Sequence, residues 1–239
     1  MREESVKKAL RLVGAVFALA FFLAPFVWMA LVSLSSSPYF LSTGSSFSPT
    51  LRNYVDVLSS GSLHLLRYLL NSIVVSAVTA VCATCLAGLA AYAITRMKFR
   101  GKIVIPILML ALSMFPQISI AGYVFRLMTS LGWINTYYAL VFPYVALALP
   151  LALWIMLSYL SQLPVDLDEA ALVDGATRMQ ILRMIILPIS LPGAVSACLL
   201  VFIYAFNEFL FAFMLTVDFR ARTIPVAYRR AGKCVANDL

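Results

Sequence analysis

Long apolar runs, separated by short polar segments, dominate this sequence. Five of the runs are long enough to cross the hydrocarbon core of a bilayer, at about 12–34, 70–95, 103–125, 137–160 and 193–217. Hydrophobic residues make up 63% of the 239 residues and charged residues only 12%, which leaves too little polar surface for a water-soluble domain. The predicted fold class is therefore all-α, a polytopic bundle of transmembrane helices.

The distribution of basic residues predicts the orientation of these helices. Lysine and arginine gather before the first run and between the second and third runs, at Arg2, Lys7, Lys8, Arg11, Arg96, Lys98, Arg100 and Lys102. The positive-inside rule then places the N-terminus, this loop and the loop after the fourth run in the cytoplasm. The first run is too long for the apolar core of a signal peptide, so we expect a retained helix of a multi-pass cell-membrane protein. The net charge of +8 comes in short groups rather than on one face, which argues against nucleic-acid binding.

Several other kinds of chemistry are excluded by motifs that the sequence lacks. It has no Gly-x-x-x-x-Gly-Lys-Ser/Thr loop, so any ATP would be bound by a partner. No nucleophile–base arrangement stands out, and we expect neither an enzyme nor a cofactor or metal site. Cys82 and Cys85 have the spacing of a redox or metal pair, but they lie inside an apolar run without a second pair. We expect them to pack as small hydrophobic residues.

The segment 164–190, between the fourth and fifth runs, carries clear local signals. Asp166 with Glu169 predicts a capping box for a helix of about 167–174, and Gly175 can take the positive φ that ends it. Thr177 with Gln180 predicts a second capping box, opening a helix that Pro188 disrupts. The segment would form a helix–turn–helix at the cytoplasmic membrane face. Either the bundle or a docking protein must bury its apolar residues, which are Leu172, Met179, Leu182, Ile185 and Ile186.

Short motifs in and around this segment occur together. Within it stand Glu169-Ala170-Ala171, then Gly175, then Ile185-x-Leu187-Pro188. Around it stand Asn71-Ser72, Ala90-Ala91-Tyr92, Arg96-x-x-Phe99-x-Gly101, Met114-Phe115-Pro116, Leu131-Gly132, Asn135-Thr136-Tyr137 and Asn207-Glu208-Phe209. The first set resembles the EAA loop of permeases from binding-protein-dependent ABC importers. The second set, in the family's order, resembles the maltose-type carbohydrate-uptake branch, and the resemblance covers about 12–227.

The resemblance implies a type I ABC importer permease that couples to a cytoplasmic ATPase dimer through its EAA loop. Such a permease pairs with a second permease subunit and receives a carbohydrate or similar small polar solute from an extracytoplasmic solute-binding protein. By this parallel the ATPase-coupling residues are Glu169, Ala170, Ala171, Asp174 and Gly175. Glu169 would pair with a basic residue of the ATPase or complete its own capping box, and Asp174 would serve helix structure or contact. The two permease subunits would move the solute by alternating access.

Asn207 and Glu208 lie in the fifth apolar run and are candidates for the transport pathway or a gate. An ionisable residue at membrane depth usually faces a cavity or a partner. The alternative is that Glu208 lies near the outer interface. The family usually has Trp before this Asn, where this chain has Phe206.

The end of the chain departs from the family pattern. Related permeases continue into a sixth helix, whereas here the resemblance fades after Ala227. We therefore expect a permease domain over 1–227 and an atypical tail over 228–239. The alternative function is a truncated, non-functional or structural membrane fragment of such a permease.

Overall fold

The computed structural model describes residues 2–36, 48–59 and 64–227. The chain divides into two units, 1–63 and 64–239. The first unit holds α1 (Arg2–Leu34) and α2 (Arg52–Ser59), with Ser35 and Pro49 forming an isolated β-bridge between them. Leu10–Leu34 is predominantly apolar, and its most apolar stretch is not buried inside the protein. This helix contains the first predicted span.

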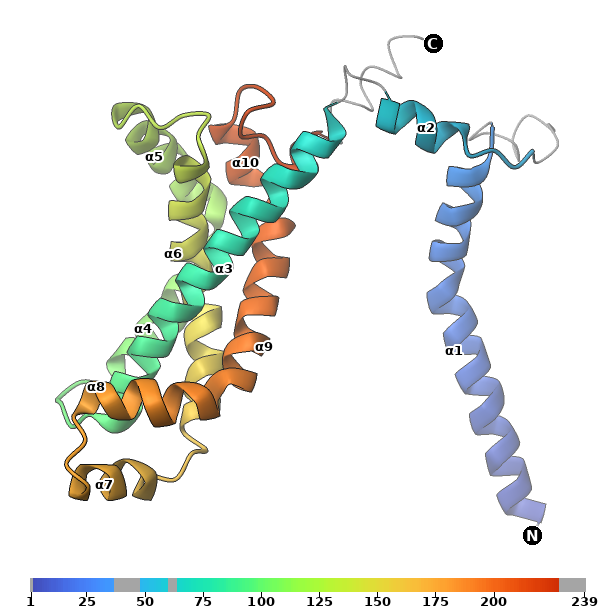
Figure 1. The fold of residues 1–239 in the computed structure, drawn as a ribbon. Coiled ribbons are helices and arrows are strands. Elements are labelled where there is room, and N and C mark those ends of the chain that lie inside the picture. Colours follow the sequence, from blue (N-terminus) through green and yellow to red (C-terminus); the bar gives the residue numbers. More distant parts are fainter. Residues whose placement is uncertain (1, 37–47, 60–63, 228–239) are drawn as a thin grey trace. The chain divides into compact units, whose positions relative to one another are not determined.

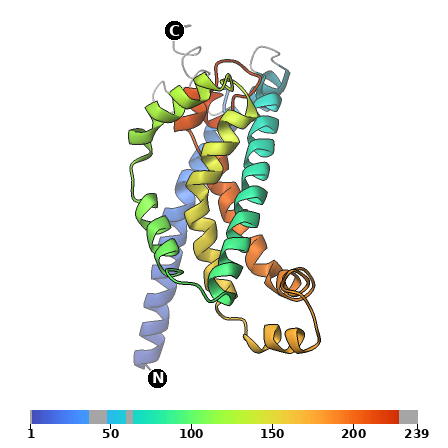
Figure 2. The ribbon, with the colours of Figure 1, turned by 90° about the vertical axis from the view of Figure 1, so that its left-hand side faces the viewer.

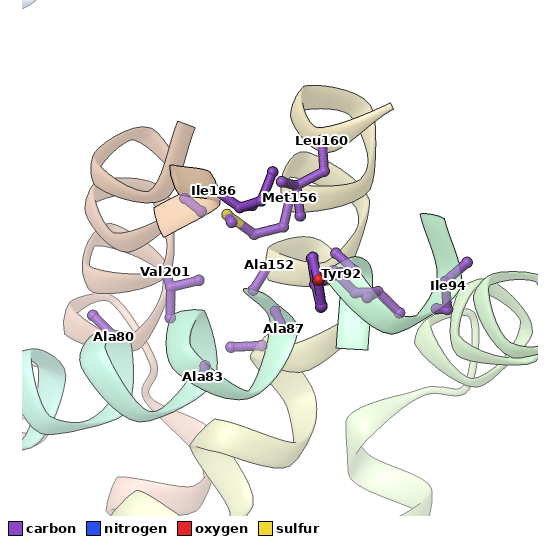
Figure 3. Packing of buried hydrophobic residues seen from close by; sticks show 14 of the residues in the cluster. Ala80, Ala83, Ala87, Tyr92, Ile94, Ala152, Met156, Leu160, Ile186 and Val201 are labelled. Atoms are coloured by element: carbon purple, nitrogen blue, oxygen red, sulfur yellow. The ribbon is translucent and has the colours of Figure 1, made fainter. Parts of the chain in front are cut away.

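The second unit is built around three long helices, α3 (Leu65–Arg96), α6 (Tyr137–Leu160) and α9 (Leu187–Phe206), which pack against one another (Figure 1). Along α3 the small side chains Ala80, Ala83, Ala87 and Ala91 recur at helical spacing, and all four are buried. Figure 3 shows three of them facing larger side chains of α6 and α9, among them Met156 and Val201. Small residues let helix backbones approach closely where lipid supplies no hydrophobic driving force. Two other small residues of α3, Gly88 and Ala90, are only partly buried.

The third apolar run does not form one straight helix. It forms α4 (Val104–Ser113) and α5 (Gln117–Ser130), which are bent by 93° at the break between them. Pro116 has φ −61° and ψ 125° at the start of α5. A proline has no N–H to continue a helix and forces the residue before it out of the α region. The run predicted as one span over 103–125 is therefore a bent pair of helices that extends to Ser130.

The fifth run also differs from its prediction. The helical stretch begins at α8 (Arg178–Ile181), passes through a π-helical turn, η1 (Leu182–Ile186), and continues as α9. Pro188 lies in the first turn of α9 and does not end the helix, because the wider π turn before it removes the need for its missing N–H. The helix stops at Phe206 rather than at 217, and a short helix, α10 (Leu210–Leu215), follows.

The membrane fold class is confirmed in the described part of the chain. Four helices are long and apolar enough to cross a membrane, or up to five if the bent pair α4 and α5 is one span. The helix α6 coincides with the predicted span 137–160, and α3 contains the span 70–95. The expected tail 228–239 lies outside the described residues.

Two short helices mark the ends of the second unit. Figures 1 and 2 both show α7 (Asp166–Val173) at one end of the bundle and α10 at the other. These two ends, called below the α7 end and the α10 end, hold the candidate functional residues.

Candidate functional site

The first turn of α7 is acidic but has no side-chain cap. Val165 precedes the helix in the αR conformation, and its carbonyl accepts hydrogen bonds from the backbone N–H groups of Asp168 (2.9 Å) and Glu169 (3.2 Å). Asp166 therefore already lies inside the helix, and the capping box predicted for Asp166 and Glu169 is wrong. The acidic side chains instead stabilise the positive end of the helix dipole.

The end of α7 follows the sequence prediction. Gly175 has φ +83°, its N–H bonds the Leu172 carbonyl at 3.1 Å, and the Ala176 N–H bonds the Ala171 carbonyl at 3.0 Å. These two bonds form a Schellman motif, which satisfies the last carbonyls of the helix. The second predicted capping box is also confirmed, because Thr177 Oγ1 accepts from the Gln180 N–H and Gln180 Oε1 accepts from the Thr177 N–H.

Most of α7 faces away from the bundle. Only Asp168 and Ala171 of its eight residues are buried, and Ala171 joins the core formed by α3, α6 and α9. Among the other predicted coupling residues, Glu169, Ala170, Asp174 and Gly175 are exposed. Within the described chain the Glu169 carboxylate makes no hydrogen bond or ion pair, so it is free to meet a partner.

The apolar side chains of the segment divide between the bundle and the surface. Ile181 and Ile186 are buried, and Leu182 and Ile185 pack against the same core. Other apolar side chains are exposed, with Val173 the extreme case at 87%; this exposed set is Leu172, Val173, Met179 and Met184. The bundle therefore covers Leu182, Ile185 and Ile186 of the predicted set, while Leu172 and Met179 stay exposed.

One ion pair at the α7 end was missed by sequence reasoning. Arg96 Nε, at the end of α3, lies 2.7 Å from Asp168 Oδ2, and the two side chains are only 3% and 4% exposed. Arg96 Nη2 also donates to the Leu163 carbonyl at 2.9 Å. Arg96 was counted among the basic residues that set topology. Arg96 opens the motif Arg96-x-x-Phe99, and Asp168 directly precedes the motif that begins at Glu169. The position of both residues at a motif is the signal that could have suggested the pair.

At the α10 end, Asn207 and Glu208 occupy the break between α9 and α10. Glu208 is 7% exposed, and its carboxylate oxygens accept the backbone N–H groups of Phe211 (3.0 Å) and Ala212 (3.3 Å). These bonds satisfy two N–H groups at the start of α10 that the helix itself leaves unpaired. Asn207 is exposed, and its amide donates back to the Ile203 carbonyl at 2.8 Å.

A hollow of about 550 Å³ opens beside these residues. Its polar wall is formed by Gln117, Tyr204, Asn207 and Glu208, and Gln117 Nε2 donates to the Tyr204 hydroxyl at 2.7 Å. Gln117 and Tyr204 were not predicted, although Gln117 directly follows the motif Met114-Phe115-Pro116. A second hollow, of about 580 Å³, lies against α3 and α6, and the polar residues of its lining include Arg67, Asn135, Thr136 and Arg220.

At the α10 end, the motif residue Asn135 hydrogen-bonds the loop that follows α10. Asn135, at φ +65°, accepts the N–H groups of Val217 (3.1 Å) and Asp218 (3.2 Å) and donates to Asp218 Oδ1 at 2.8 Å. The hydrogen bond from Asn135, with another from the backbone N–H of Arg220, holds the pKa of the Asp218 carboxyl below its usual value. Asparagine tolerates this left-handed conformation better than most residues.

Cys82 and Cys85 both lie on the exposed face of α3 rather than in its packed stripe. Their predicted burial is wrong for this chain. Among the described residues, no three His, Cys, Asp or Glu side chains gather as a metal site would require.

The described helices form a polytopic membrane bundle with a short helix at one end and a hollow at the other, as expected for a membrane transport component. Residues 83–228 match the family described as binding-protein-dependent transport system inner membrane component. The chain belongs to this family.

Individual relatives agree with this assignment. The trehalose/maltose transport system permease protein MalG of Thermococcus litoralis is 53% identical over 227 residues, covering 95% of this chain and 82% of the relative. The trehalose transport system permease protein SugB of Mycobacterium tuberculosis is 41% identical over 159 residues, covering 66% of this chain and 58% of the relative. A chain from the crystal structure of a bacterial ABC transporter involved in the import of the acidic polysaccharide alginate matches with a TM-score of 0.77 at 21% identity, covering 99% of this chain and 87% of that chain.

Proposed function

We propose that this permease imports a carbohydrate of the trehalose or maltose kind, or a similar small polar solute, as one half of a translocation pathway. A second permease subunit would supply the other half, and an extracytoplasmic binding protein would deliver the solute. The names of the relatives MalG and SugB support this substrate class. The comparisons give no support to the alternative of a non-functional membrane fragment, and we do not propose it.

The observation that carries the proposal is the face of α7 that points away from the bundle. It combines the unpartnered carboxylate of Glu169 with exposed apolar side chains, among them Leu172 and Val173. An exposed acid beside exposed apolar residues suits a basic and apolar cleft on another protein. That protein would be one subunit of a cytoplasmic ATPase dimer, which binds the ATP that this chain has no P-loop to hold.

This assignment orients the chain. The α7 end and the N-terminus would face the cytoplasm, which agrees with the basic residues around Arg96 and Lys98. The α10 end would then face outward, toward the binding protein. Glu208 would lie in the outer half of the membrane. The two hydrogen bonds by which it caps α10 would offset part of the free-energy cost of burying a carboxylate there.

The hollow beside α10 suits the passage of a sugar. Amide and hydroxyl groups of Gln117, Tyr204 and Asn207 can exchange hydrogen bonds with the hydroxyl groups of a carbohydrate. Closure of the ATPase dimer would displace α7, and the two permease subunits would alternate between inward- and outward-facing states. The chain itself would carry out no chemical reaction.

The test is reconstitution. The chain would be produced with a second permease, an ATPase and a binding protein from its own genome, and purified through a tag on the ATPase. We expect the chain to co-purify, and proteoliposomes holding the complex to accumulate labelled trehalose or maltose only with ATP and binding protein. Replacing Glu169 by Lys should weaken co-purification, while the same change at the exposed Gln162, outside α7, should not. Co-purification unaffected by Glu169→Lys would contradict the docking role.

A further inference from the structure

Few side chains of the proposed coupling helix α7 contact the rest of the second unit. Of its two buried residues, Ala171 offers a single methyl group, and Asp168 offers the ion pair with Arg96. Asp168 and Ala171 stand three positions apart, so they share one face of the helix. In the described chain, the closest polar contact between α7 and the bundle is therefore the ion pair of Asp168 and Arg96, at 2.7 Å and without the geometry of a hydrogen bond.

Arg96 gathers three parts of the chain at one point. It is the last residue of α3, its Nε contacts Asp168 of α7, and its Nη2 bonds the Leu163 carbonyl in the connection that leads from α6 to α7. A planar guanidinium with several donors is suited to hold such a junction, because it can bond a carboxylate and a carbonyl at once. A lysine could not reproduce this geometry.

The pair is isolated from water and from other charges. Both side chains are nearly fully buried, and in the described chain no second acid pairs with Arg96 and no second base with Asp168. The other basic residues nearby, Lys98 and Arg100, are exposed. Removing either partner would leave a buried charge without compensation, which strongly disfavours any state in which α7 separates from α3.

Arg96 also lies at the end of the longest helix of this unit. At 32 residues, α3 is about 48 Å long. Near its other end Asn71 bonds the carbonyls of Phe219 and Arg222, in the loop after α10. A displacement applied at Arg96 therefore reaches the α10 end through one continuous helix.

We propose that Arg96 and Asp168 form the joint through which movement of α7 passes to α3, and that α7 and the end of α3 move as one body during transport. The proposal rests on the proposed function, in which an ATPase moves α7. Arg96 and Asp168 would act as positioning residues, through the contact between α7 and α3 rather than on the solute or the ATP.

Single replacements in the full importer complex give the first test. Arg96→Gln and Asp168→Asn should leave ATPase association and hydrolysis largely in place, while the solute transported per ATP hydrolysed falls at least fivefold. The exchange Arg96→Asp with Asp168→Arg should recover part of this ratio. Arg100→Gln and Asp166→Asn, which remove exposed charges from neighbouring positions, are the matched controls and should leave the ratio unchanged. An unchanged ratio in both single variants would overturn the proposal.

A covalent joint gives the second test and does not depend on how well the single variants fold. In a chain whose Cys82, Cys85, Cys198 and Cys234 are replaced by Ser, Arg96→Cys and Asp168→Cys would be bridged with a short bifunctional thiosulfonate reagent. Bridging should raise transport per ATP at least threefold over the unbridged double variant, and reduction should remove the gain. Hydrolysis without transport in the bridged complex would show that α7 and α3 must move apart, and would overturn the proposal.

The two hypotheses fail in different ways. If the complex with the unaltered chain transports no sugar or does not bind the ATPase, the proposed function is wrong. If the unaltered complex transports sugar and the bridged complex does not, only the joint is wrong.

Discussion

The hydroxyl of Tyr137, the first residue of α6, donates to Oδ1 of Asn71 in α3 at 2.6 Å. The same Asn71 side chain donates from Nδ2 to the carbonyls of Phe219 (3.1 Å) and Arg222 (2.9 Å). One buried amide thus fastens two helices and the loop after α10. Its neighbour Ser72 accepts the N–H of Ile224 at 2.8 Å, which extends the same fastening.

Asn71→Leu should destabilise the protein strongly. The replacement keeps the approximate size of the side chain but leaves the Tyr137 hydroxyl and two carbonyls without their partner, at about 1–3 kcal/mol for each group that stays buried. Thermal unfolding of the purified protein in detergent measures the change. Thr129→Ala, which removes an exposed hydroxyl bonded only within its own helix, should shift stability by less than about 0.5 kcal/mol. Equal effects of the two replacements would contradict the fastening role.

The local signals in the sequence predicted the parts of the fold that short-range chemistry decides. Hydropathy located α3 and α6, and the positive φ of Gly175 and the capping box of Thr177 followed from the residue types alone. The angle of 93° between α4 and α5 could not be predicted from Pro116, because a proline removes a hydrogen bond without fixing the angle that follows.

Long-range contacts could not be predicted in this way. Arg96 and Asp168 are far apart in the sequence, and each had a simpler local explanation, as a topology-setting charge and as a helix N-terminal acid. Glu208 was recognised as unusual, but its hydrogen bonds to Phe211 and Ala212 depend on where α9 stops. Hydropathy does not show this stop, since the apolar run continues through it.

Replacing Gly175 tests the turn that ends α7. A side chain added there would meet no neighbouring atom, so the cost comes from the φ of +83° alone, about 1–2 kcal/mol for an ordinary residue. Gly175→Val should therefore disturb the end of α7 and reduce both ATPase association and uptake. Gly175→Asn is the matched control, because Asn tolerates this conformation, and it should retain most activity. Full ATPase association and uptake in Gly175→Val would show that the turn is not needed for coupling.

Glu208 offers a way to separate capping from gating. Glu208→Ala removes both acceptors and should cost about 1–3 kcal/mol for each buried N–H left unpaired. Glu208→Gln keeps one oxygen acceptor and should lose less stability. If Glu208→Gln has near-normal stability but uptake reduced at least tenfold, the charge itself takes part in transport. Uptake that simply follows stability across both variants would assign Glu208 to capping alone.

Acid should loosen the loop held by Asn135. The pKa of Asp218 is lowered in the folded protein, so its ionised form favours the folded loop. This stabilisation is complete above the usual aspartate pKa of about 3.9 and is lost as the pH falls through the lower folded value. Below about pH 4, the unfolding temperature of the unaltered protein should fall more steeply than that of Asp218→Asn. The difference should be small, because the carboxylate is exposed to solvent; parallel curves would rule out the contribution.

The pair Gln117 and Tyr204 should affect how the solute is bound on its way through the hollow. Tyr204→Phe keeps the ring but removes the hydroxyl that holds the Gln117 amide at 2.7 Å, so the amide loses its orientation. Because one neutral hydrogen bond is worth about 0.5–1.5 kcal/mol, the concentration of sugar-loaded binding protein needed for half-maximal uptake should rise roughly two- to tenfold. Tyr123→Phe, on the exposed face of α5, removes a hydroxyl outside the hollow and should leave uptake unchanged. Since both variants lose the same atom, a rise seen with both would point to a general effect on the bundle, and a rise with neither would remove this pair from the pathway.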